Sequence, residues 1–514
     1  MLVSDLVAHH ARSRPDSTAL VVGERRITYA ELQSLVDATA AALRARGIGH
    51  GDRVSVLGKN GLEYVQLYFA TAALGAILVP LNFWHRAPEH AHAVTDAEPS
   101  LLVAERDYEP VLDAARAALP AGATTLRLPG PEDDRAEWDA FLHDGVPGPA
   151  PAVHEDDVHM ILYTSGTTGR PKGAMLAHRR TVDDAVAMAA VMRVRERDVF
   201  ANYFPPFHVG NWDHMKPFLL MGATVVIMRE FDAGRVLEVL ARERVSVVLG
   251  VPTMLHALIT HPDFAATDTS SVRLLYYGAY DPSGIMDRTA AAFGAREGRI
   301  QMAHTYGLTE AGPFVTWCPP EDVFERWGSI GRPMPGVDVV LLDPEGRPVA
   351  PGEPGEICLT GPRMSGYWRD EEASARALAG GWLHTGDVAV ADADGFLTIV
   401  DRTKDMIRSG GQNVWSKQVE DCLAGHPAVV DAAVIGLPDP VYEERVVAIV
   451  VAVPDVGTGP ELGDQLRAFV RRELAGYNTP SEVVFRTELP RTAVGKVQKH
   501  VLRAELTAPT APTA

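Results

Sequence analysis

The chain has 514 residues, of which 46% are hydrophobic and 22% charged, a composition typical of a globular protein that buries a large core. At about 150 residues per domain, the length predicts about three structural units. The net charge of −19 argues against general binding to nucleic acid or to an anionic membrane, because both are polyanions. The three cysteines are scattered, which argues against a disulfide scaffold and a cysteine zinc site and indicates a reducing compartment, the cytoplasm.

The N-terminal residues contain acidic and histidine interruptions where a signal peptide would need a continuous apolar segment, so we expect no export. Residues 67–84 form the most apolar segment of the chain. Thr71, Gly75, Pro80 and Asn82 interrupt it, which favours a buried helix followed by a buried strand. The sequence therefore predicts no stable membrane insertion.

Short apolar strands alternate with helical segments from the N-terminus onward. Residues 19–22 and 26–28 read as two strands, and Thr28 with Glu31 forms a capping box at the start of a helix. The alternation predicts an α/β fold with largely parallel sheets. Further strands are expected at residues 53–57, 77–80, 101–103, 224–227, 245–249 and 272–275.

The pattern of expected helices, strands and connections changes at several points along the chain. The proline-rich residues 145–156 read as an extended connection, and residues 331–400 alternate strands with Gly/Pro turns. Mixed α/β patterning returns at residue 401, and residues 507–514 read as a disordered tail. We expect a large N-terminal domain of α/β subdomains with a small β-rich subdomain, followed by a small α+β domain.

One segment combines a strand with a run of hydroxyls and glycines. Residues 160–163 are apolar, and residues 164–174 read TSGTTGRPKGA. Glycines allow backbone N–H groups to approach a phosphate, and Ser and Thr hydroxyls add donors. The spacing differs from the GxxxxGK[ST] loop, which argues against a P-loop NTPase. A flexible surface turn is the simpler interpretation of such clusters, but the preceding strand and the following lysine favour phosphate binding.

The run YTSGTTGRPKGA resembles the signature of the adenylate-forming superfamily, which comprises acyl-CoA synthetases, adenylation domains of peptide synthetases and luciferases. Further segments resemble that family's other motifs in the same order, and together they span most of the chain. These segments are FPPFHVG at 204–210, YGA at 277–279, YGLTE at 306–310, WLHTGD at 382–387, DRTKDMI at 401–407 and LPRTAVGK at 489–496.

The resemblance implies that the protein binds ATP, Mg2+ and coenzyme A and assigns roles to individual residues. Catalytic roles fall on Lys496, Glu310, Thr309 and His208, and metal contacts on Glu310 and Thr167. ATP or AMP binding falls on Thr164, Ser165, Gly166, Thr167, Thr168, Gly169, Lys172, Gly278, Ala279, Tyr306, Gly307, Thr309, Asp387, Arg402 and Lys496. The expected acyl-pocket residues are His208, Val209, Trp212, Asp213, Tyr277 and Gly307, and the expected CoA-binding residues are Gly410, Gly411 and Gln412.

The same resemblance implies a two-step reaction and a moving lid. A carboxylate attacks the α-phosphorus of ATP to give acyl-AMP and pyrophosphate, and a thiol then displaces AMP. Residues 1–400 would form the N-terminal adenylate-forming domain, with the ATP and acyl sites, and residues 401–506 a lid that rotates about the hinge Asp401. Lys496 would serve the first step, and the face around Gly410 the second.

Two features bear on the branch of the family. Amino-acid-activating relatives carry an aspartate after the pocket phenylalanine, but here His208 follows Phe207, so the substrate is expected to be a carboxylic acid other than an α-amino acid. Trp212 favours a ring or compact acyl group, and Asp213 and His214 indicate one polar contact with the substrate. The segment around residue 416 departs from the family pattern, with Ser416 in a proline position and Gln418 for an acid.

Three functions stay open at this point. The first is an acyl-CoA ligase acting on a small-molecule carboxylic acid. The second is an enzyme that loads a separate carrier protein, docked on Arg467, Arg471 and Arg472. The third is a specialised protein that runs only one half-reaction. The sequence does not name the acid and does not settle the oligomeric state, for which a homodimer is one option.

Overall fold

The structure is a computed structural model that describes residues 1–130, 133–146, 148, 151–164, 171–279, 284–403, 405–410, 412–454, 456–491 and 497–507. Internal contacts divide the chain into two units. The first unit consists of Met1–Ala279, Met286–Val339 and Leu359–His384, and the second of Tyr280–Ile285, Val340–Cys358 and Thr385–Ala514.

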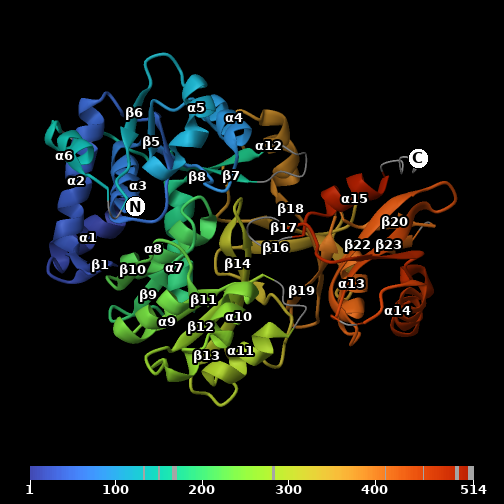
Figure 1. Ribbon diagram of the computed structural model, residues 1–514. Helices are drawn as coiled ribbons and strands as arrows, with labels where there is room; N and C mark the ends of the chain where they lie inside the picture. Colours follow the sequence, from blue (N-terminus) through green and yellow to red (C-terminus); the bar gives the residue numbers. More distant parts are fainter. Residues whose placement is uncertain are drawn as a thin grey trace. The chain divides into compact units, whose positions relative to one another are not determined.

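The first unit is built mostly from alternating helices and strands, drawn from blue to yellow in Figure 1, with α12 in orange. Its helices are α1 (Asp5–Ser13), α2 (Tyr29–Ala45), α3 (Leu62–Leu74), α4 (Ala87–Ala97), α5 (Glu109–Ala117), α6 (Ala136–His143), α7 (His178–Val191), α8 (Val209–Leu220), α9 (Ala233–Arg242), α10 (Pro252–Thr260), α11 (Ile285–Phe293) and α12 (Glu371–Ala377). Its strands are β1 (Thr18–Val22), β2 (Arg25–Thr28), β3 (Arg53–Leu57), β4 (Ile77–Pro80), β5 (Leu101–Ala104), β6 (Thr124–Arg127), β7 (Val158–Thr164), β8 (Lys172–Ala177), β9 (Val199–Asn202), β10 (Thr224–Ile227), β11 (Val247–Gly250), β12 (Leu274–Gly278), β13 (Gln301–Leu308), β14 (Gly312–Cys318) and β15 (Arg332–Pro333).

Two sheets organise the described part of this unit. One has the order β15-β14-β13-β12-β11-β9-β10-β1-β2, and the other the order β6-β5-β3-β4-β7-β8. The central pairs β12·β13 and β11·β12 are parallel, whereas β13·β14 and β7·β8 are antiparallel. Parallel strands joined by helices confirm the expected α/β fold.

Local sequence signals explain several of these elements. The Thr28 hydroxyl accepts the Glu31 backbone N–H and the Glu31 carboxylate accepts the Thr28 N–H, so the predicted capping box starts α2. Within the apolar segment, α3 is buried almost all round and the four residues of β4 are all buried. The prediction of a buried helix followed by a buried strand is confirmed. None of the described helices has both the length and the hydrophobicity to cross a bilayer.

Apart from Tyr280–Ile285, the second unit contains part of the predicted β-rich region, whose strands β16, β17 and β18 cross the boundary between the units, and a small α+β domain. Its elements are β16 (Asp338–Leu342), β17 (Pro354–Thr360), β18 (Leu383–Ala391), β19 (Leu397–Arg402), β20 (Ile407–Ser409), β21 (Gln412–Val414), α13 (Ser416–Ala424), β22 (Val429–Asp439), β23 (Glu443–Ala452), α14 (Pro460–Glu473), β24 (Glu482–Arg486) and α15 (Lys499–Thr507). Strands β16 to β19 form a four-stranded sheet in chain order, and β20 to β24 form a five-stranded sheet.

The C-terminal sheet has a hydrophobic core on each face. One core packs buried residues of α13 and α14, such as Val419 and Leu466, against Val434 and Val450 of the sheet. On the opposite face Leu502 of α15 packs against Ile435 and neighbouring residues. This arrangement confirms a small C-terminal domain of mixed character. Residues 508–514, which cover most of the expected tail, lie outside the described residues.

Candidate active site

The carboxyl ends of β12 and β13 present the motif residues of the first unit. The two strands are parallel, with Tyr277 opposite His304 and Gly278 opposite Thr305. Their carboxyl ends therefore meet at one edge of the sheet, where α/β proteins usually bind ligands. Thr309 and Glu310 follow β13 in the turn before β14.

Glu310 lies at the centre of a group of hydroxyls. The Tyr367 hydroxyl donates to Glu310 Oε1 at 3.0 Å, and the Thr164 hydroxyl at the end of β7 donates to the same oxygen at 3.4 Å. The backbone carbonyl of Glu310 accepts the Met364 N–H at 2.6 Å. Two segments distant in sequence therefore hold this residue, one at Thr164 and one at residues 364–367.

Lys172 belongs to the same group. It is the first residue of β8, and its ammonium lies 5.2 Å from the centre of the Tyr367 ring, within the range of a cation–π contact. Burial raises the pKa of Tyr367, and the Glu310 charge raises it further, so the hydroxyl stays protonated and donates. Strand β8 also binds the Tyr367 segment through the Trp368 N–H, which donates to Gly173 O at 2.7 Å.

Sequence reasoning missed Tyr367. A tyrosine in a Gly-Tyr-Trp run after a strand has no local feature that separates a functional residue from a core residue. Its role becomes visible only because the segment after β17 returns to β8, where Ala174 and Tyr367 form a β-bridge. We add Tyr367 to the candidate site.

The YGA loop has a constrained backbone. Ala279 has φ of +76°, a left-handed conformation that side chains seldom adopt and that marks many ligand-binding loops. The preceding Tyr277 stacks on His304 with ring centroids 4.2 Å apart. His304 Nδ1 hydrogen-bonds the Ser329 carbonyl at 2.7 Å, and burial lowers the pKa of His304 to about 4, so the ring is neutral. The stacked and hydrogen-bonded His304 therefore supports Tyr277, the first residue of this loop.

Gly307 and Tyr306 lie on β13. A Cβ at Gly307 would collide with the carbonyl of Gly312 on β14, so only glycine fits this close approach. Tyr306 is buried. The structure thus explains in packing terms why a glycine follows this tyrosine.

His208 caps α8 and has a defined orientation. Its Nδ1 accepts the Gly210 N–H at 2.9 Å, so the neutral ring carries its proton on Nε2. Trp212, one turn further, is 1% exposed and stacks on Tyr68 with centroids 4.3 Å apart. Its indole N–H donates to Pro206 O at 2.5 Å. These contacts give Trp212 a place in the core, and its acyl-pocket role stays a prediction.

Asp213 lies in a buried group of charges. Its carboxylate binds Arg180 of α7 at 2.8 Å and the Lys216 ammonium one turn along α8, and all three side chains are at most 3% exposed. Burial by itself raises the pKa of Asp213, but the charges of Lys216 and Arg180 hold it down at about 2. Burial raises the pKa of nearby Asp184 to about 7, against the attraction of Arg180.

This group changes the interpretation of Asp213. The expected polar contact with the acyl group needs a carboxylate with a free face, whereas both oxygens of Asp213 are bound by cations of the protein. We read its main role as neutralising Arg180 and Lys216 inside the unit. Gly312 lies against this group, because a Cβ there would meet Arg180 and Asp184 at 3.0 Å.

Asp387 and Arg402 of the second unit face each other across β18 and β19. They are opposite residues of the antiparallel pair, and Arg402 Nε lies 2.9 Å from Asp387 Oδ1. The Asp387 side chain is 8% exposed and that of Arg402 46%. The structure therefore brings two of the predicted ATP-binding residues together.

Asp401, the predicted hinge residue, is a hydrogen-bond centre. Its buried carboxylate accepts the Arg402 N–H at 2.7 Å and the Ser416 hydroxyl at 2.9 Å. The Lys499 ammonium of α15 donates to Ser416 Oγ at 2.7 Å and also pairs with Glu420 at 2.7 Å. Ser416, which replaces the family's usual proline, thus links the predicted hinge to the last helix.

The remaining predicted residues differ in how far the structure describes them. Gly410 directly follows β20 and has φ of +59°, and Gln412 begins β21. On α14, Arg467 donates to Pro480 O at 3.0 Å and Arg472 pairs with Glu473 at 2.8 Å. The predicted site residues outside the described part of the chain are Ser165, Gly166, Thr167, Thr168, Gly169, Gly411 and Lys496.

Comparison with known proteins assigns a family to this arrangement. The sequence model described as "AMP-binding enzyme" matches residues 7–368, and that described as "AMP-binding enzyme C-terminal domain" matches residues 418–496. The chain belongs to the AMP-binding enzyme family. The resemblance drawn from the motifs is thereby confirmed.

Relatives of this AMP-binding enzyme match it along nearly its whole length. A feruloyl-CoA synthase from Amycolatopsis sp is 41% identical, with 96% of each chain covered. An indoleacetate–CoA ligase from Aromatoleum aromaticum is 36% identical, with 98% of each chain covered. The structure of the anthranilate CoA ligase AuaEII with anthranoyl-AMP has a TM-score of 0.86 at 28% identity, covering 98% of this chain and 97% of the other.

The buried ion pairs generate a prediction about stability. Replacing Asp213 by alanine leaves Arg180 and Lys216 buried without their anion, so we expect the free energy of unfolding to fall by about 3–5 kcal/mol. Urea unfolding followed by tryptophan fluorescence measures this loss. Asp183→Ala, an exposed neighbour of Asp184 on α7, is the control and should change the value by less than about 0.5 kcal/mol. Equal losses in the two variants would contradict the assignment.

Proposed function

We propose that this chain is an ATP-dependent acyl-CoA ligase that activates a carboxylic acid as acyl-AMP and transfers the acyl group to coenzyme A. The observation that carries the proposal is the group formed by Thr164, Lys172, Glu310 and Tyr367, next to the hydroxyl- and glycine-rich motif. Relatives named as CoA synthases and ligases, matched over nearly the whole chain, support the same reaction.

In the first step a carboxylate oxygen of the acid attacks the α-phosphorus of ATP. The bond from that phosphorus to the bridging oxygen breaks, and pyrophosphate leaves with the bonding electrons. Lys172 faces the negative charge of the phosphates, and Asp387 accepts the ribose hydroxyls. Lys496, outside the described residues, would place its charge on the carboxylate and α-phosphate oxygens. The enzyme acts by positioning and by electrostatic stabilisation.

Mg2+ is part of the proposal, and the residues present fit it. Mg2+ prefers oxygen ligands and often binds through one carboxylate together with substrate phosphates. Glu310 offers such a carboxylate, and because the Thr164 and Tyr367 hydroxyls both bind its Oε1, Oε2 is the oxygen proposed to bind the cation. The ion would neutralise phosphate charge. Thr309, beside Glu310, would donate to the α-phosphate.

In the second step the sulfur of coenzyme A attacks the acyl carbonyl. A thioester bond forms, the carbonyl–phosphate oxygen bond breaks, and AMP leaves with that oxygen while the thiol proton passes to solvent. We place CoA against the face around Gly410 and Gln412. The enzyme would work in the cytoplasm, where its three free cysteines stay reduced.

The acid is proposed to carry an aromatic ring. Ferulate, indoleacetate and anthranilate, in the names of the relatives, are all aromatic carboxylates. Beside His208, α8 presents His214 to Tyr276 and Phe314, with ring centroids 5.6 Å apart in each pair. The His214 ring is neutral, because burial lowers its pKa to about 3, and its Nδ1 lies 2.9 Å from the Tyr276 hydroxyl. A planar ring suits such aromatic surroundings.

Loading of a carrier protein is the less favoured function. Arg467 and Arg472, two of the three arginines proposed for docking, already contact groups of their own unit. The relatives named above are CoA enzymes.

Tyr367 provides a test of the Glu310 arrangement. Tyr367→Phe keeps the ring and removes the donor to Glu310, and a hydrogen bond to a charged group contributes about 1.5–3 kcal/mol. We expect kcat/KM for MgATP in pyrophosphate exchange to fall about tenfold, and the Mg2+ concentration for half-maximal rate to rise. Tyr477→Phe, an exposed tyrosine, is the control. Unchanged magnesium dependence would contradict the proposed role of Glu310.

A panel of acids tests the proposed reaction and the acid class. Ferulate, indoleacetate, anthranilate, hexanoate and palmitate are each incubated with ATP, Mg2+ and coenzyme A. Thioester and AMP are quantified by mass spectrometry, and pyrophosphate exchange is measured in parallel. We expect equal amounts of thioester and AMP, with the highest kcat/KM for one of the aromatic acids. Pyrophosphate exchange without thioester would favour carrier loading. Palmitate as the best substrate would overturn the aromatic assignment.

A further inference from the structure

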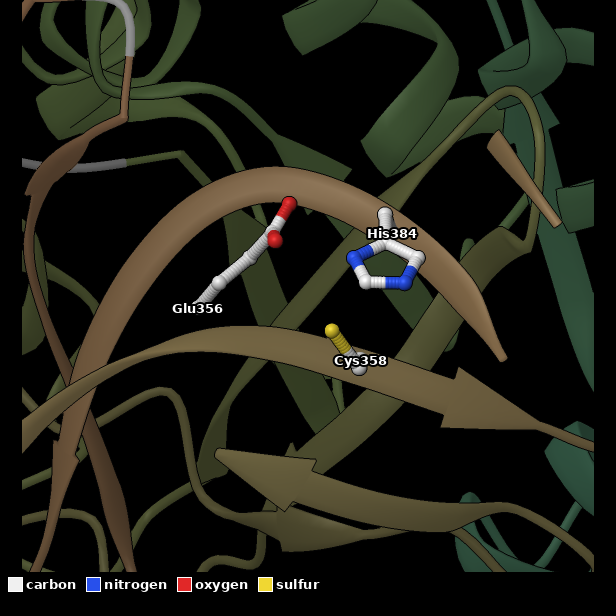
Figure 2. Close-up of side chains that lie close together, drawn as sticks. All are labelled: Glu356, Cys358 and His384. Carbon is white, nitrogen blue, oxygen red and sulfur yellow. The ribbon is translucent and has the colours of Figure 1, made fainter. Parts of the chain in front are cut away.

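Glu356, Cys358 and His384 lie together on neighbouring strands β17 and β18 (Figure 2). Each offers an atom able to bind a metal, and these atoms are within 4.8 Å of one another. A cysteine ligand must be a thiolate, however. Burial, the charge of Glu356 and the hydrogen bond to Glu356 together raise the pKa of the Cys358 thiol to about 12, so in the absence of a metal ion the sulfur keeps its proton. We therefore interpret the three side chains as a hydrogen-bonded group without a metal ion.

The Glu356 carboxylate is directed to the backbone of the TGD segment. Its Oε1 accepts the Gly386 N–H at 2.9 Å, and the carboxylate also accepts the Cys358 thiol. Gly386 has φ of +72°, and a Cβ there would meet nothing within 4 Å. Glycine is thus needed for its backbone conformation and not for space. Because glycine has little conformational preference of its own, hydrogen bonds must hold it in one state.

Both neighbours of Gly386 are held as well. The Thr385 hydroxyl donates to Ile357 O of β17 at 2.8 Å and accepts the Asp387 N–H at 3.1 Å. The Gly386 carbonyl accepts the Thr403 N–H at 2.9 Å. Among the described residues, the side chain that accepts the Gly386 N–H is that of Glu356.

We infer that Glu356 is a positioning residue for nucleotide binding: it fixes Gly386 so that the Asp387 carboxylate is aimed at the ribose hydroxyls. Asp387 is paired on its other side with Arg402, at 2.9 Å, so a shift of Gly386 would move both. This inference rests on the proposed function, in which Asp387 binds the ribose. Cys358 assists, because its thiol donates a hydrogen bond to the same carboxylate.

The test compares ATP with dideoxy-ATP, which lacks both ribose hydroxyls. Binding of each nucleotide is measured by calorimetry in the absence of acid and coenzyme A. The wild type should prefer ATP, and Glu356→Ala should reduce that preference about tenfold by weakening ATP binding alone. Glu356→Gln keeps an oxygen for the Gly386 N–H and should retain most of the preference. Glu353→Ala, an exposed acid just before β17, is the control.

Each outcome is decisive. A general loss of structure in Glu356→Ala would weaken both nucleotides equally and would overturn the inference, as would an unchanged preference. A loss of ATP affinity on treating the wild type with a zinc chelator, restored by Zn2+, would show a metal site and also overturn it. If the wild type binds neither nucleotide, it is the proposed function that fails.

Discussion

The position of the Glu310 carboxylate is the constraint on which the candidate site depends. A carboxylate that is to face phosphates must be held against their repulsion, and here two hydroxyls and a backbone N–H hold the residue. Glu310 follows β13 of one sheet of the first unit, and the hydroxyls come from the end of β7 in the other sheet and from the segment after β17. The group therefore exists only when these distant segments have come together.

A group of buried charged side chains stabilises the packing of α7 against α8. Arg180, Asp213 and Lys216 tie α7 to α8, and Gly312 of β14 lies close to Arg180. Removing one partner of such a group is costly, so the position of α8, and with it of His208, is strongly fixed. The acidic net charge of −19 does not oppose nucleotide binding, because a few cations and backbone donors act locally.

The parts of the fold that were predictable depend on neighbours in sequence. The Thr28–Glu31 capping box and the buried strand β4 follow from local spacing and composition. Many site residues could be named because the motifs resemble those of a family. Contacts between residues far apart in sequence gave no such signal. Tyr367 hydrogen-bonds Glu310, 57 positions earlier in the chain, and Asp213 binds Arg180, 33 positions earlier. Ser416, first seen as a departure from a pattern, has a reason only in its bond to Asp401.

The central claim is that an acid is activated as its acyl adenylate before the thiol attacks. Labelling both carboxylate oxygens of the preferred acid with heavy oxygen tests this directly, since the attacking oxygen stays on phosphorus when AMP leaves. After turnover with ATP and coenzyme A, mass spectrometry should find one heavy oxygen in AMP and none in pyrophosphate. Heavy oxygen in inorganic phosphate, with ADP as the nucleotide product, would show an acyl phosphate route and contradict the account.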